Sequence, residues 1–167
     1  MKVLIVYGST TGNTASIAEA LAKQIDNAGH NATLVNASDA SADGLCDGFD
    51  AVLFGCSAWG TDTIELQDDF QPIFDDLDKT GVKGKKAAAF ASGDSNFEFF
   101  CGAVDAIEEA LKGLGVDLME DGLKVEGDYS DSSDDVDAWG ERILAALYDA
   151  LNVTSGRISA QGMRLFG

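Results

Sequence analysis

The chain has 167 residues, 46% of them hydrophobic, which is enough apolar material for the core of one globular domain. Its 29 acidic and 11 basic residues give a net charge of −18, which argues against nucleic acid or an anionic membrane as a partner, because both are polyanions. Cys46, Cys56 and Cys101 are far apart and form no paired motif, which argues against a disulfide framework or a metal centre. We therefore expect a reducing, cytoplasmic location and a partner with a basic surface.

The chain begins with an apolar run over residues 3–7, which predicts a strand buried on both faces of a parallel sheet. A loop of hydroxyls and one carboxamide follows at residues 9–14, at the start of a predicted helix whose N–H groups and dipole favour an anion. No Lys or Arg lies between Lys2 and Lys23, so a phosphate would be held there without a cation. The helix is predicted from the apolar residues that share one of its faces: Ile17, Ala18, Leu21, Ala22 and Ile25.

Two common nucleotide-binding motifs are excluded at this first loop. A P-loop requires a Lys that is absent, and a dinucleotide fingerprint requires a third glycine besides Gly8 and Gly12. The alternative to a phosphate site is a loop whose polar residues only cap the helix and form a turn.

Three more strands are predicted in the next part of the chain, and the second and third of them end in polar loops. Residues 31–36 predict a short strand, and residues 49–56 predict a second buried strand that ends in a loop starting at Ser57. A helix is expected over about residues 68–77. A further apolar run at residues 87–91 also ends in a polar loop, which extends to Cys101.

The rest of the chain completes an alternating pattern of strands and helices. A helix is predicted over residues 103–114, a last strand over residues 116–125 with a break at residues 120–122, and a final helix from about Ser132. This pattern predicts a three-layer, doubly wound α/β fold with five parallel strands. Ligands of such sheets bind at the carboxyl ends of the strands, where the three loops converge.

The C-terminal residues have no sustained apolar period. We therefore predict one domain over residues 1–151 and a loosely ordered tail over residues 152–167. A partner-binding role and an artificial extension are both open for this tail.

Aromatic residues occur in the second and third loops. Trp59 lies beside Gly60, and the third loop combines Asp94 with Phe97, Phe99 and Phe100. Aromatic residues at two such positions indicate a flat conjugated ring held between them, which together with the phosphate loop predicts a mononucleotide site. The alternative is that these side chains fold back into the core.

Several segments closely resemble the short-chain flavodoxins of Desulfovibrio type: residues 9–14, 55–60, 65–70, 93–95 and 100–109. The resemblance covers about Met1 to Leu147. It implies strand order 2-1-3-4-5, non-covalently bound FMN and one-electron transfer between low-potential redox proteins. It therefore implies an electron carrier and not an enzyme.

The resemblance also assigns roles to individual residues. It implies a phosphate loop formed by Ser9, Thr10, Thr11, Gly12, Asn13 and Thr14, and a loop on the inner face of the flavin formed by Ser57, Ala58, Trp59 and Gly60. It implies that the outer face and the pyrimidine edge are framed by residues of the third loop: Ser92, Gly93, Asp94, Phe97, Phe99 and Cys101. Phe97 stands where the family commonly has Tyr, and Thr61 stands where an acid is frequent.

Two other functions of related folds are less well supported. A receiver domain requires a phosphorylatable Asp at the end of the third strand, where this chain has Gly55, Cys56 and Ser57. A small FMN-dependent reductase shares the fold and would be revealed by steady consumption of NAD(P)H. We expect a monomeric electron carrier that docks to redox proteins with basic surfaces and binds neither membranes nor nucleic acid.

Overall fold

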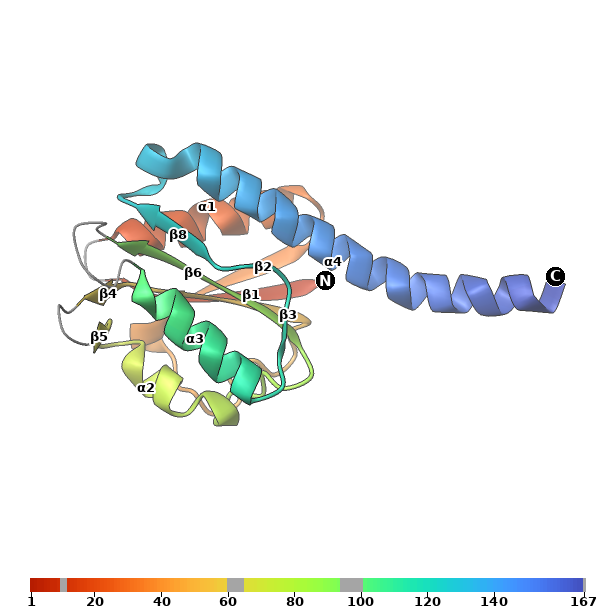
Figure 1. Ribbon diagram of the computed structural model, residues 1–167, viewed down its shortest axis with the longest axis horizontal. Helices are drawn as coiled ribbons and strands as arrows, with labels where there is room; N and C mark the ends of the chain where they lie inside the picture. The colour runs from red at the N-terminus through yellow and green to blue at the C-terminus, as the bar shows by residue number, and fades with distance from the viewer. Residues whose placement is uncertain (10–11, 60–64, 94–100, 167) are drawn as a thin grey trace.

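The computed structural model describes residues 1–9, 12–59, 65–93 and 101–166 (Figure 1). The main elements in chain order are β1 (Lys2–Gly8), α1 (Asn13–Asn27), β2 (Asn31–Asn36), β3 (Ala51–Cys56), β6 (Lys86–Gly93), α3 (Gly102–Gly113), β7 (Asp117–Leu118), β8 (Leu123–Glu126) and α4 (Tyr129–Phe166). Shorter elements are β4 (Ala58–Trp59), β5 (Glu65–Leu66), α2 (Gln71–Asp75) and two 3₁₀ turns, η1 (Ala37–Asp39) and η2 (Leu77–Lys79).

The central sheet is parallel and has the order β2-β1-β3-β6, with both β7 and β8 on the far side of β6. β7 pairs with Lys86 and Ala87, whereas β8 pairs with residues 90–93, so the two short strands share one position in the sheet. The predicted order 2-1-3-4-5, with an interrupted last strand, is therefore confirmed. β4 and β5 form a separate antiparallel pair that the sequence pattern did not predict.

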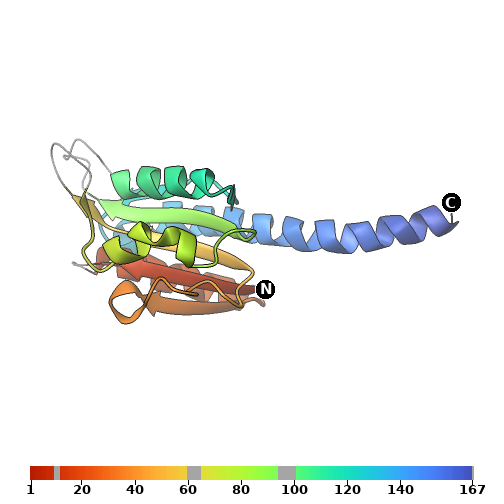
Figure 2. The ribbon, with the colours of Figure 1, turned by 90° about the horizontal axis from the view of Figure 1, so that it is seen from below.

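Helices cover both faces of the sheet, which gives the predicted three layers (Figures 1 and 2). Alternate residues of β1 face opposite cores: Val3 packs with α1 and α4, and Leu4 packs with α2 and α3. A Cβ on Gly55 would lie 2.3 Å from the Phe90 ring, so a glycine is needed where this ring crosses β3. Phe90 in turn packs on Trp139 of α4, with ring centroids 6.1 Å apart.

The helix expected over residues 68–77 is shorter than predicted. Its regular part is α2, and a 3₁₀ turn follows at η2. The segment before α2 forms a turn because the side-chain oxygen of Gln67 accepts hydrogen bonds from the N–H groups of Asp69 and Phe70. Pro72 then occupies the first turn of the helix, where its missing N–H costs no intrahelical bond.

α4 is longer than the predicted final helix. It has a break in helical geometry at Ser132 (φ −132°, ψ 24°) and packs against the body through residues as far as Leu147. Its backbone then continues as a helix to Phe166 and extends away from the sheet (Figures 1 and 2). The loose order expected for residues 152–167 stays a prediction. Within the described segments, no helix combines the length and the apolar content needed to cross a membrane.

Candidate functional site

The carboxyl ends of β1, β3 and β6 lie at one edge of the sheet, opposite the free end of α4 (Figure 1). Gly8 and Cys56 are register partners at the ends of β1 and β3, and the Ser57 N–H donates to the Gly8 carbonyl oxygen at 3.2 Å. The loops that follow these strands therefore begin side by side, as the sequence pattern predicts.

The first loop leads directly into α1. Gly12 precedes the helix with φ +90°, and its N–H donates to Ser9 Oγ at 3.1 Å. The helical bond from Ser16 N–H to Gly12 O sets the start of the ladder, so the N–H groups of Asn13 and Thr14 have no acceptor within the helix. Thr10 and Thr11 lie outside the described residues.

The donor set at this helix start fits a phosphate monoester. It combines first-turn N–H groups with the hydroxyl of Ser9 and the carboxamide of Asn13, all of which can donate to phosphate oxygens. No atom of the described residues lies within 4 Å of where a Cβ on Gly12 would be, so the described part of the chain leaves this side of the helix start open. The positive end of the helix dipole would favour the charge in place of a Lys or Arg.

Thr14 and Ser57 join the first loop to the second. Thr14 is fully buried, and its hydroxyl lies 2.8 Å from Ser57 Oγ in a hydrogen bond. The Ser57 carbonyl oxygen accepts from the Gln67 N–H at 2.9 Å, and this bond holds the start of the second loop in place. Ala58 and Trp59 are described by their backbone in β4, and Gly60 lies outside the described residues. The predicted role of these three residues at the flavin stays a prediction.

The third loop begins at the end of β6 and is fixed by Ser92. This buried side chain donates its hydroxyl hydrogen to the carbonyl oxygen of Gly127, at the corner between β8 and α4. Asp94, Phe97 and Phe99 lie outside the described residues, so their predicted contacts with the flavin ring stay predictions. Gly93 lines a hollow of about 460 Å³ together with Asn13, Glu126, Gly127 and Asp131.

Cys101 ends the third loop, and its thiol lies in the core. Its side chain is buried, and its Sγ lies 3.6 Å from Ala91 O and 3.5 Å from Val125 O. Burial raises the pKa of this thiol to about 11. The thiol is therefore directed between β6 and β8, and the predicted contact with the flavin edge would have to come from the backbone.

Sequence reasoning assigned no role to the corner between β8 and α4. Glu126, Gly127 and Asp131 share the hollow with Asn13 and Gly93, and Gly127 has φ +72°. The signal that could have found them is their place directly after the last strand, at the edge where ligands of such sheets bind.

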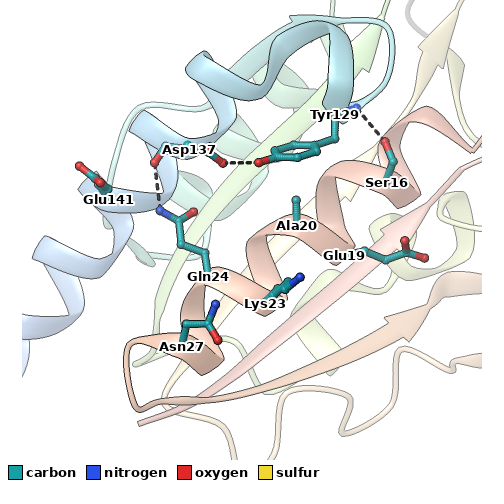
Figure 3. A pocket seen from close by; sticks show the side chains of 9 residues that line it. All are labelled: Ser16, Glu19, Ala20, Lys23, Gln24, Asn27, Tyr129, Asp137 and Glu141. Carbon is teal, nitrogen blue, oxygen red and sulfur yellow. Dashed lines mark hydrogen bonds between the residues drawn. The ribbon is translucent and has the colours of Figure 1, made fainter.

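A larger hollow of about 650 Å³ lies between α1 and α4, on the side of the molecule (Figure 3). Tyr129 spans it, with its hydroxyl donating to Asp137 Oδ1 at 2.8 Å. Gln24 Nε2 donates to the Asp137 carbonyl oxygen at 3.1 Å. Among its lining residues, Ser16 belongs to the first turn of α1.

Comparison with known proteins relates this chain to one protein family. The sequence model of the Flavodoxin family matches residues 5–139. The flavodoxin of Nitratidesulfovibrio vulgaris (strain DSM 19637 / Miyazaki F) is 54% identical over 145 residues, which cover 87% of this chain and 98% of that protein. The flavodoxin of Maridesulfovibrio salexigens is 49% identical over 142 residues, with 85% and 96% covered. The crystal structure of oxidised Flavodoxin 2 from Bacillus cereus superposes with a TM-score of 0.78 at 34% identity, over 89% of this chain and 99% of that one.

Proposed function

Because this chain belongs to the flavodoxin family, whose members carry electrons on bound FMN, we propose that its FMN lies at the carboxyl ends of β1, β3 and β6. FMN supplies the electron chemistry, and the protein binds it, orients it and shields it from water. The chain is an electron carrier and not an enzyme. Its matched relatives are named flavodoxins, and nothing in the comparisons favours the FMN-dependent reductase.

One observation carries the proposed placement: the start of α1 is open and lined with donors, and it adjoins the second loop. Thr14, at this start, is hydrogen-bonded to Ser57 at the end of β3. The phosphate of FMN would lie on the first turn of α1, with Ser9, Thr10, Thr11, Gly12 and Asn13 around it. The ring would extend between the second and third loops, with Trp59 on its inner face and Phe97 on its outer face.

A pair of asparagine variants tests this placement. Asn13→Ala removes a donor at the start of α1, and we expect FMN to bind at least about tenfold more weakly, or about 1.4 kcal/mol. Asn31→Ala is the control, because Asn31 is an exposed residue at the amino end of β2, on the opposite edge of the sheet. Titration of the flavin-free chain with FMN measures both affinities. Equal losses of FMN affinity in the two variants would contradict the placement of the phosphate at the start of α1.

The charge of the chain supports a redox partner with a basic docking surface. Asp68 and Asp69 are exposed just after β5, on the side where the second loop ends. Carboxylates at the rim of the site would steer a basic protein toward the flavin, and salt would screen this attraction. We expect electron transfer to a basic redox protein to slow as ionic strength rises. Transfer that is insensitive to salt would contradict electrostatic docking.

The three cysteines support a reducing location. Cys46, Cys56 and Cys101 are all free and buried. We therefore propose that the protein is cytoplasmic. We also propose, as a separate point, that it is a monomer. Sedimentation of the FMN-loaded chain tests the oligomeric state, because a dimer would double the measured mass.

A further inference from the structure

Ser16 connects the first turn of α1 to the start of α4 (Figure 3). Its hydroxyl donates to the Asn13 carbonyl oxygen at 2.7 Å and accepts from the Tyr129 N–H at 2.9 Å. The direction of both bonds is fixed by chemistry, because a backbone N–H only donates and a carbonyl oxygen only accepts. The result is a continuous chain of bonds from Tyr129 N–H through Ser16 to the Asn13 carbonyl.

This chain of bonds ends on the peptide that faces the proposed phosphate. The carbonyl of Asn13 and the N–H of Thr14 belong to one peptide group, and the N–H lies in the first turn of α1. A carbonyl that accepts a hydrogen bond polarises its peptide, which makes the N–H of that peptide a stronger donor. The Ser16 bond also restricts the rotation of this peptide about the helix start.

The corner that supplies the Tyr129 N–H is itself held in place. Ser92 at the end of β6 donates to the Gly127 carbonyl oxygen, two residues before Tyr129. Asn13, Gly93 and Gly127 line the same hollow of about 460 Å³. The corner therefore joins the first loop to the third, and Ser16 is its connection to the first loop.

We propose that Ser16 is a positioning residue for the phosphate of FMN. Its hydroxyl accepts from the Tyr129 N–H and, through its bond to the Asn13 carbonyl oxygen, fixes and polarises the Asn13–Thr14 peptide. The proposal rests on the placement of FMN proposed above. It assigns no direct contact between Ser16 and the cofactor.

The test compares FMN with riboflavin, which has the same ring and no phosphate. For Ser16→Ala we expect FMN to bind about 5–20-fold more weakly while riboflavin affinity changes less than about twofold. Ser16→Thr retains the hydroxyl and should restore FMN affinity, since Ser16 borders the 650 Å³ hollow that has room for a methyl group. Ser130→Ala is the control, because the Ser130 hydroxyl donates to a neighbour in the same corner, Asp128 Oδ1, and not to the first turn of α1.

A second pair of variants tests the backbone donor. Tyr129→Pro and Tyr129→Ala both remove the phenol, but only proline removes the N–H that Ser16 accepts. Proline is tolerated there because Tyr129 is the first residue of α4. We expect Tyr129→Pro to lower the preference for FMN over riboflavin as Ser16→Ala does, and Tyr129→Ala to leave it unchanged.

The outcomes separate this inference from the function on which it rests. If the unmodified chain shows no preference for FMN over riboflavin, the proposed phosphate site is wrong. If that preference exists but Ser16→Ala and Tyr129→Pro retain it, or weaken both flavins equally, Ser16 has only a structural role and the inference is overturned.

Discussion

The loops before α1 and α3 both end in a residue with positive φ, Gly12 at +90° and Cys101 at +49°. Gly12 is exposed, and among the residues that the structure describes no atom lies within 4 Å of where its Cβ would be. Cys101 is buried, and its thiol bonds to backbone carbonyls of β6 and β8. One helix start is therefore open to a ligand, and the other is anchored in the core.

The two residues reach the same backbone region at different cost. Glycine adopts positive φ with almost no penalty, whereas a residue with a Cβ loses about 1–2 kcal/mol. At Cys101 the burial of the side chain offsets this cost. The comparison shows how a loop end can be fixed either by the absence of a side chain or by burying one.

The largest effect is expected in the loop that Cys101 ends. Phe97→Ala should weaken the binding of FMN and riboflavin alike, by about 1–3 kcal/mol, because stacking area on the ring is lost. In the loop before α1, by contrast, substitutions at the phosphate site should weaken the binding of FMN and not that of riboflavin. Fluorescence titration with both flavins measures it, and unchanged affinities would place Phe97 away from the ring.

The next effect concerns the open helix start. Gly12→Ala should lower the free energy of unfolding by about 1–2 kcal/mol, because alanine resists φ +90° although space is available. Gly113→Ala is the matched control: its Cβ also meets no atom within 4 Å, and Gly113 lies in α3 without positive φ. Alanine there should be neutral or stabilising. Equal effects in urea unfolding would show that Gly12 is not required for its backbone conformation.

A smaller effect is expected from the anchored helix start as pH rises. Burial raises the pKa of Cys101 to about 11 from 9.0, so the unfolded chain releases this proton at lower pH than the folded protein does. The stability from the neutral buried thiol is complete below pH 9 and is lost as pH rises toward 11. Between pH 8 and pH 10 the loss should be about 1 kcal/mol greater in the unmodified chain than in Cys101→Ala. Identical pH profiles would mean that the thiol is not shielded.

The smallest effect is expected at the end of the molecule farthest from both helix starts. Truncation after Leu151 removes the projecting part of α4 and should change FMN affinity by less than about threefold, or about 0.7 kcal/mol. Titration of the truncated chain checks this. A larger loss would show that the segment packs on the body in solution.

Much of this fold follows from apolar patterning. The doubly buried strands and the break in the last strand can be predicted from the sequence, because burial selects apolar residues at fixed spacing. The start of α1 is also predictable, since glycine and small polar residues favour a helix start.

Polar contacts between distant elements could not be predicted. Ser16 and Tyr129 are 113 residues apart, and nothing in their local sequence indicates that they meet. The direction of the Cys101 thiol depends on backbone oxygens of two strands that come together only in the folded sheet. The β4–β5 pair has only two residues in each strand, too few to show a period.

The break between β7 and β8 also bears on how copies of this protein meet in concentrated solution. An outer strand with a long row of unpaired backbone groups is a template for pairing with another molecule. Here the outer strand beside β6 is divided into two segments, β7 with two residues and β8 with four. Between them, the Asp121 carbonyl oxygen accepts from Trp139 Nε1 at 2.7 Å, and a Cβ on Gly122 would lie 2.1 Å from Val104. The break is thus built into the packing, and it shortens the row of backbone groups that this side of the sheet could offer to another copy.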